Sequence, residues 1–162
     1  AFCRAHGAAL QHVKPHGALY NMAVGNEPLA RAIAEAVASV DANLMLVTLA
    51  GDEAPLMARI GRETGLRVVY EAFPDRAYTA QGRLVSRRLP GAVIHDPAEA
   101  AARALTMARD GRIVAIDGTP LEMEIHTLCV HGDTPTALAL VAEIQRTLVQ
   151  AGVTLRPMGA AD

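Results

Sequence analysis

The sequence predicts an α/β fold in which parallel strands alternate with helices. Short apolar runs rich in branched residues alternate along the chain with longer, alanine-rich amphipathic runs. The strand-like runs are apolar almost throughout, which is typical of strands that helices cover on both faces. Pro and Gly fall at regular points, and neither a repeat nor a long linker interrupts the pattern. We therefore expect residues 1–162 to form a single domain.

In the first half of the chain, strands and helices are predicted in alternation. Residues 11–15 and 44–49 read as strands, and residues 28–40 between them repeat apolar side chains at helical spacing. Residues 53–63 form the next predicted helix, because their amphipathic pattern stops shortly before a glycine. Residues 67–72 follow as a strand rich in branched side chains.

The second half contains two helices whose starting points are marked by capping residues. A helix over residues 97–110 begins with an Asp96 N-cap and a proline at the first helical position, and Glu99 stands where a reciprocal cap would lie. Thr134 and the proline after it give the same start signal to a helix over residues 135–150. Both helices are expected to pack against the sheet.

Branched apolar runs predict further strands at residues 112–116, 125–130 and 153–155. In parallel α/β folds, the loops that leave the carboxyl ends of strands hold the chemistry. The candidate functional residues are therefore sought directly after each predicted strand.

The composition excludes several function classes. Hydrophobic residues make up 51% of the chain and charged residues 20%, which excludes disorder, and a net charge of −2 gives no basic stripe for nucleic acid. No apolar run approaches the roughly 20 residues that a membrane span needs. Cys3 and Cys129 lie far apart and fit neither a zinc site nor a redox pair, so we expect reduced thiols in a cytoplasmic protein.

The densest polar cluster follows the first predicted strand. It holds Lys14, His16, Gly17, Tyr20 and Asn21, and Lys14 is the only lysine among 15 lysine and arginine residues. Two residues apart on an extended segment, the ammonium and the imidazole point the same way, which suits anion binding and proton transfer. The alternative is a solvated loop, but such a loop does not need the only lysine of the chain.

Asp75 and Arg76 directly follow the strand at residues 67–72. A carboxylate beside a guanidinium can serve as a base and an anion clamp, or can merely pair on the surface for about 0.2 to 1 kcal/mol. Of Arg87 and Arg88, one is a candidate fork for a carboxylate or phosphate and the other a solvated charge.

His131 and Asp133 end the apolar run before the last predicted helix. They can form a base with its orienting group, ligate a metal, or act as a helix-end charge. The chain has no P-loop, no GxGxxG and no GxSxG motif, so a nucleotide site would be of another kind.

Four segments resemble the LamB/YcsF family. They are KPHGALYN (14–21), FPDRAY (73–78), LVSRRLPGAVI (84–94) and CVHGD (129–133), and the similarity runs over nearly the whole chain. The resemblance implies a parallel (β/α) barrel of the glycoside hydrolase/deacetylase type. It also implies a hydrolase that opens 5-oxoproline to glutamate with ATP as co-substrate and with two further subunits, B and C.

Two departures from the family pattern affect these expectations. The family's opening Asp-Leu-Asn strand and its Cys-Gly-Phe-His and His-Pro motifs are absent here, so the chain is expected to be an incomplete barrel, equivalent to the carboxyl-terminal two thirds. It also starts on Ala1, within what looks like the end of a helix. A smaller departure is Pro74, where alanine is common in the family.

The resemblance and the chemistry together assign roles. A lactam resists hydrolysis, so phosphorylation of its oxygen by ATP creates a leaving group, and the developing charge needs cations. The assignment is charge stabilisation by Lys14 and Arg76, proton transfer by His16 or His131, and orientation by Asp75 or Asp133. Substrate binding is assigned to Arg76 and Arg87 with Gly17, Tyr20 and Asn21. One alternative is metal-dependent hydrolysis with His16 and His131 as ligands to a divalent ion. Another is a non-catalytic substrate-binding subunit, and a homo-oligomer is compatible with each.

Overall fold

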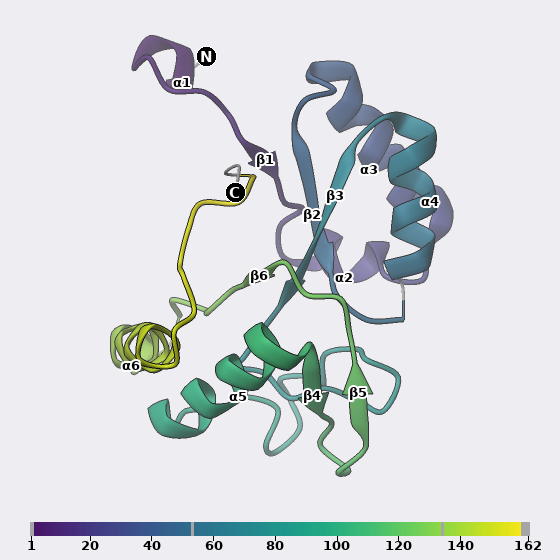
Figure 1. The fold of residues 1–162 in the computed structure, drawn as a ribbon. Coiled ribbons are helices and arrows are strands. Elements are labelled where there is room, and N and C mark those ends of the chain that lie inside the picture. The colour runs from purple at the N-terminus through teal and green to yellow at the C-terminus, as the bar shows by residue number, and fades with distance from the viewer. Residues whose placement is uncertain (1, 53, 134, 160–162) are drawn as a thin grey trace. The chain divides into compact units, whose positions relative to one another are not determined.

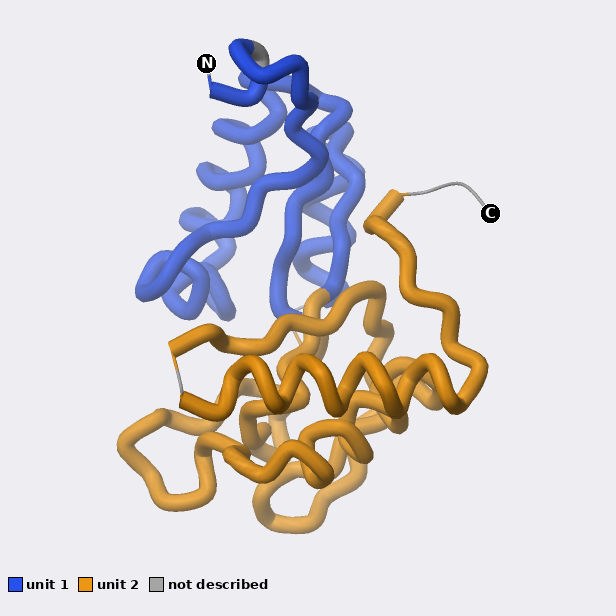
Figure 2. The backbone as a smooth tube through the Cα atoms, turned by 90° about the vertical axis from the view of Figure 1, so that its left-hand side faces the viewer, with its two compact units in different colours: residues 1–49, 53–70 blue, residues 50–52, 71–162 orange. Residues whose placement is uncertain are grey.

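A computed structural model describes residues 2–52, 54–133 and 135–159. The chain divides into two compact units, one made of residues 1–49 and 53–70 and the other of residues 50–52 and 71–162 (Figure 2). Each unit is described by itself below. The predicted single domain over residues 1–162 stays a prediction.

Unit 1 carries the helices and strands of the first half of the chain (Figure 1). In order these are α1 (Phe2–Ala5), β1 (His12–Val13), α2 (Ala18–Ala23), α3 (Glu27–Val40), β2 (Met45–Leu49), α4 (Ala54–Thr64) and the start of β3 (Arg67–Ala72). The sequence predicts all of them except α2, although β1 is shorter than expected.

Unit 2 begins at the end of β3 and holds the rest of the chain. Its further elements are α5 (Pro97–Asp110), β4 (Arg112–Val114), β5 (Pro120–Glu122), β6 (Thr127–Leu128) and α6 (Ala137–Gln150). The bounds of β3 and α5 are those that the sequence predicts. Asp96 caps α5 as expected, because its Oδ1 accepts a hydrogen bond of 2.7 Å from the Glu99 amide.

The main sheet has the strand order β1-β2-β3-β6. β1 pairs with β2 in parallel, and β3 pairs with β6 in parallel through Glu71 opposite Thr127 and Ala72 opposite Leu128. The predicted α/β class with a parallel sheet is confirmed. β3 passes from unit 1 to unit 2, so the residues that follow it belong to unit 2.

In unit 1, apolar faces of α3 and α4 are buried together with β2, where Leu46 and Val47 are each 1% exposed. A glycine allows α4 to approach β3 closely. A Cβ atom at Gly61 would lie 2.5 Å from Val68 Cγ2, so a larger residue would push helix and strand apart.

In unit 2, α5 lies beside α6 (Figure 1), and side chains of the two helices form one apolar cluster. Ala100 and Ala104 on α5 pack with Leu140, Ile144 and Leu148 on α6, and all of these side chains are buried. Small residues on one helix and large ones on the other let the two helices interlock. This packing holds α5 in place. A side chain of α5 in turn contacts the candidate site.

Some predicted elements of unit 2 are wrong. Residues 112–116 were expected to join the parallel sheet, but β4 pairs antiparallel with β5 in a separate hairpin. Residues 153–155 form no strand, because the Val153 amide instead donates to the Leu148 carbonyl at the end of α6. The predicted N-cap Thr134 lies outside the described residues, and α6 begins at Ala137 rather than at residue 135.

Within the described ranges, the structure contains no helix that is both long enough and apolar enough to cross a bilayer.

Candidate functional site

The loop that follows β3 is held in one conformation by hydrogen bonds to its backbone. The buried Tyr78 hydroxyl accepts a hydrogen bond of 2.8 Å from the Phe73 amide, and the Ile94 amide donates to the Asp75 carbonyl at 2.9 Å. Burial raises the pKa of the Tyr78 phenol, so this hydroxyl stays neutral. Arg103 on α5 donates from Nε to the Pro74 carbonyl at 3.1 Å and from Nη2 to the Arg76 carbonyl at 2.8 Å.

Asp75 and His131 form a hydrogen-bonded pair, which we call the Asp75–His131 dyad. Asp75 Oδ2 accepts from the His131 backbone amide at 2.9 Å and contacts His131 Nδ1 at 2.8 Å. An ionised carboxylate only accepts hydrogen bonds, so Nδ1 carries the proton and Nε2 presents its lone pair. The dyad therefore has the arrangement of a base and the group that orients it.

Burial differs sharply between the two members of the dyad. The Asp75 side chain is 3% exposed and that of His131 is 25% exposed, so the imidazole is the member that solvent or a ligand can reach. The ring stacks on Phe73, with centroids 5.1 Å apart and planes 18° apart. Asp75 Oδ1 is buried and accepts no hydrogen bond from the described residues. Oδ2 is therefore the oxygen of Asp75 that contacts His131, through both the backbone amide and Nδ1.

Arg76 lies inside unit 2 instead of on its surface. Its Nε donates to the Ala92 carbonyl at 3.2 Å and its Nη2 to the Val85 carbonyl at 2.6 Å, and the residue is 6% exposed. Burial lowers the pKa of the guanidinium. Neither the surface pair with Asp75 nor an exposed anion clamp is formed, and the predicted substrate-binding role of Arg76 stays a prediction.

Arg87 and Asp133 form an ion pair at the surface of unit 2. Arg87 Nη1 lies 2.6 Å from Asp133 Oδ2, with side chains 45% and 56% exposed. The hydrogen bond from Arg87 holds the pKa of Asp133 below its ordinary value. Asp133 is therefore bonded to an arginine and not to a histidine, which leaves Asp75 as the group that orients His131.

The Lys14 cluster belongs to unit 1 and follows β1. Lys14 Nζ lies 5.5 Å from the centroid of the Tyr20 ring, within the range of a cation–π contact. Gly17 caps α2 with a φ of +60°, a conformation that glycine adopts without strain. Asn21 donates to the Gly17 carbonyl at 3.4 Å, and the His16 side chain is exposed.

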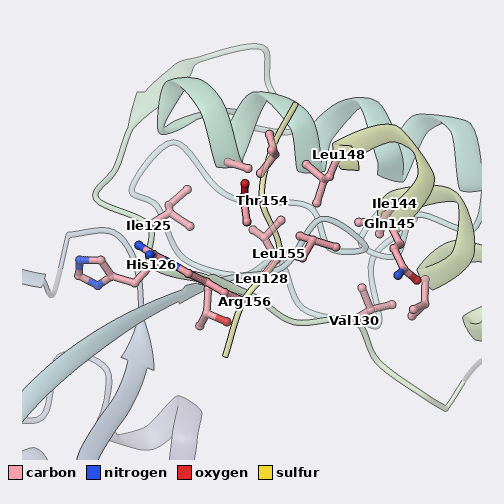
Figure 3. Close-up of a pocket in the computed structure, with 14 residues that line it drawn as sticks. Ile125, His126, Leu128, Val130, Ile144, Gln145, Leu148, Thr154, Leu155 and Arg156 are labelled. Carbon is pink, nitrogen blue, oxygen red and sulfur yellow. The ribbon is translucent and has the colours of Figure 1, made fainter. Parts of the chain in front are cut away.

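A groove in unit 2 of about 580 Å³ contains none of the predicted site residues. Figure 3 shows its largely apolar lining from α6, from residues 125–130 and from the segment after α6. His126 lies at its edge and is hydrogen-bonded to Glu124 at 3.0 Å. The groove therefore offers packing surface rather than catalytic groups.

The described residues do not fit the metal alternative by themselves. Nowhere in the described ranges do three or more His, Cys, Asp or Glu side chains gather as a metal site would require. His131 has one ring nitrogen bonded to Asp75. We therefore derive no step through a metal ion, and the divalent ion stays an untested expectation.

Sequence reasoning overlooked two residues that shape the dyad. Phe73 stacks on the imidazole, and Arg103 binds the carbonyls on either side of Asp75. Arg103 could have been found from its position, since it lies within the buried stripe of Ala100, Ala104 and Met107 on α5, at helical spacing. Nothing in the local sequence marks Phe73 as a stacking partner.

The chain has close relatives of known name. The LamB/YcsF family matches it over residues 1–162. Proteins named as the A subunit of 5-oxoprolinase are 51% identical over 159 residues in Pyrococcus furiosus and 49% identical over 160 residues in Syntrophobacter fumaroxidans. The alignments cover 98% and 99% of this chain but 61% and 62% of those relatives, so the chain spans about three fifths of their length.

A solved structure shares the fold. The lactam utilization protein from Thermus thermophilus is 45% identical, with a TM-score of 0.85 over 96% of this chain and 60% of that protein. This similarity agrees with the parallel α/β arrangement of β1, β2, β3 and β6.

Proposed function

The chain belongs to the LamB/YcsF family, and from this premise we propose that it forms part of a 5-oxoprolinase A subunit, which hydrolyses the lactam of 5-oxoproline to glutamate. Relatives of that name and a lactam utilization protein support this reaction class. The observation that carries the proposal is the Asp75–His131 dyad, because lactam hydrolysis needs a group that accepts a proton from water.

In the proposed reaction, ATP is a co-substrate. Its γ-phosphoryl group is transferred to the lactam oxygen, and ADP leaves. Water then adds to the activated ring carbon while His131 Nε2 takes its proton, and the C–N bond of the tetrahedral intermediate breaks to leave a γ-glutamyl phosphate. A second water adds to the same carbon, and the C–O bond to phosphate breaks to give glutamate and inorganic phosphate. The ring nitrogen leaves with a proton, for which protonated His131 is the donor.

The cationic residues keep the roles that the sequence predicts, as proposals. Lys14 stabilises charge on the phosphoryl group or on the tetrahedral centre. Arg87 binds the substrate carboxylate through the guanidinium nitrogens that it does not use for Asp133, since only Nη1 contacts that carboxylate. The alternative roles are proton transfer by His16 and orientation by Asp133. Substitution of each residue, followed by an activity measurement, tests them.

Isotope labelling tests the role of ATP. The full-length protein, assembled with the proposed B and C subunits, is given ATP and 5-oxoproline carrying ¹⁸O in its lactam carbonyl. We expect glutamate, ADP and phosphate in equal amounts, with the label in the phosphate as seen by ³¹P NMR. Unlabelled phosphate would overturn the proposed cleavage of the C–O bond to phosphate, and an absence of glutamate would overturn the proposed function.

Two controls separate the alternatives. Omitting the A subunit from the assembly should abolish glutamate formation, whereas a chelator selective for transition metals, added with Mg²⁺ in excess, should not change it if no metal other than that of MgATP takes part. A site variant, His131→Asn, distinguishes a catalytic from a merely binding subunit. If this variant turns over at the wild-type rate, the chain binds substrate without contributing the base.

A further inference from the structure

Arg103 makes two contacts that bracket the residue on which the dyad depends. Its Nε and Nη2 bind the carbonyls of Pro74 and Arg76, the neighbours of Asp75 on either side. The Asp75 carbonyl itself is bonded to the Ile94 amide at 2.9 Å. Three consecutive carbonyls are therefore held, and Arg103 holds two of them.

These contacts leave few ways for Asp75 to move. A peptide plane whose oxygen is hydrogen-bonded cannot rotate without losing that bond, and the loss is costly where water does not replace it. With the planes before and after Asp75 both fixed, its Cα–Cβ direction is fixed as well. The carboxylate then points at the amide and the Nδ1 of His131.

The guanidinium of Arg103 directs both of these hydrogen bonds at carbonyl oxygens rather than at a carboxylate. Burial lowers its pKa, so the placement costs free energy that an exposed arginine would not lose. Lysine is a poor substitute at this position, because only the planar guanidinium reaches two carbonyls at a fixed separation.

We propose that Arg103 is a positioning residue that holds Asp75, and through it the imidazole of His131, in the orientation required for proton transfer. It does not touch the reacting atoms. The proposal deepens the proposed function, and it rests on that function only for its activity measurement. The orientation of His131 can be tested without turnover.

The first test measures the reactivity of His131 in the full-length protein. Diethyl pyrocarbonate modifies the imidazole nitrogen that carries a lone pair, and peptide mass spectrometry gives the rate for His131 separately. Asp75→Asn should slow this reaction, because the carboxylate holds the ring in the orientation and tautomer that leave the lone pair on Nε2. Arg103→Met, of similar length but without the fork, should slow it most of the way to the Asp75→Asn value.

A double variant shows whether Arg103 acts through Asp75. Adding Arg103→Met to Asp75→Asn should leave the rate within about twofold of Asp75→Asn alone, because coupled residues are not additive. A separate, additive slowing would overturn the proposal. The matched control is Arg109→Met on the same helix, whose exposed guanidinium binds Asp110 and should leave His131 at the wild-type rate.

Folding and activity complete the test. Circular dichroism and the thermal midpoint identify the variants that fold, and if Arg103→Met does not, Arg103→Lys decides. The proposal is overturned if the folded variant, Arg103→Met or Arg103→Lys, is modified at His131 at the wild-type rate. In the assembled enzyme, kcat should fall on the order of 100-fold with little change in KM, the scale of a misplaced catalytic group. If His131 reactivity falls but wild-type enzyme opens no lactam, the proposed function fails and the positioning role stands.

Discussion

The loops after β1 and after β3 each carry a motif with predicted site residues, and they are built in different ways. Residues 14–21 in unit 1 present His16 and Asn21 at the surface, with Lys14 against the Tyr20 ring. Residues 73–78 in unit 2 are buried, and Tyr78, Ile94 and Arg103 hold their backbone. The loop after β1 has polar side chains at the surface, whereas the side chains of the loop after β3 are buried.

The difference indicates a division of labour. A buried loop whose carbonyls are bonded can fix a proton acceptor before substrate arrives, which reduces the cost of reaching the transition state. Lys14, half-buried against an aromatic ring, offers a compact ammonium to a charged ligand. The buried loop therefore suits proton transfer, and the exposed loop suits charge binding.

The largest effect is expected at the imidazole that the buried loop orients, from His131→Asn. The asparagine amide can still donate to Asp75, as Nδ1 does, but the lone pair of Nε2 is lost. We expect kcat to fall by about 10²- to 10⁴-fold with the thermal midpoint close to wild type. The control is His126→Asn, which alters an exposed histidine of unit 2 and should retain activity.

At the exposed loop, Lys14→Ala should remove activity without unfolding the protein. Loss of one preorganised charge donor corresponds to about 2.7 to 4 kcal/mol of transition-state stabilisation, or 100-fold or more in kcat. Lys14→Arg should fail as well, because a planar fork does not replace a compact ammonium. Steady-state kinetics of both variants is the measurement. Wild-type turnover in Lys14→Arg would show that arginine can replace the ammonium group of Lys14.

Tyr78→Phe tests the rigidity of the buried loop. The Phe73 amide loses its acceptor, which should lower the free energy of unfolding by about 1 to 3 kcal/mol in urea titrations. The folded-state pKa of Tyr78 is raised by burial, so its contribution is complete below the ordinary value of 10.0 and is lost as pH rises above it. The wild type should therefore lose stability in alkali more steeply than Tyr78→Phe.

The matched control for this effect is Tyr70→Phe in unit 1, where the hydroxyl donates to the Ala54 carbonyl at 2.9 Å. This variant keeps Tyr78, so it should keep the steep alkaline loss. Equal alkaline slopes for wild type and Tyr78→Phe would show that another group governs that range.

The smallest effect is expected at the surface of unit 2. Arg87→Ala removes an exposed ion pair, so the thermal midpoint should not change measurably. KM for 5-oxoproline should rise about tenfold, the scale of one hydrogen bond to a charged group. Arg88→Ala, one residue along and also exposed, should leave KM unchanged, and a rise of equal size in both variants would argue against a specific carboxylate fork.

Local signals in the sequence account for much of the fold. The Asp96 cap and the branched run of residues 67–72 define α5 and β3 to the residue, because hydrogen bonds and side chains within a few positions determine both. The β4–β5 hairpin was missed for the opposite reason. Its pairing partner and direction depend on tertiary packing, and a short strand carries little information about either.

The candidate site was predictable in its members but not in its pairings. The positions of Asp75 and His131 after strands placed both among the candidates, yet the sequence left Asp75 and Asp133 as equal choices for orienting a histidine. The structure assigns Asp75 to His131 and Asp133 to Arg87, which are contacts across 56 and 46 positions. Such pairings follow from the packing of whole helices and strands, which local sequence patterns do not specify.

The distance in sequence between Asp75 and His131 has a consequence for how the protein folds. The dyad closes a loop of 56 residues that contains α5 and the β4–β5 hairpin. Closing a loop of this length costs chain entropy that only completed tertiary packing can offset, so the pair forms late in folding. Helices can re-form while the two side chains are still apart. In a refolding experiment, recovery of the dyad should lag behind recovery of helical signal, and partly denatured protein should lose the dyad first.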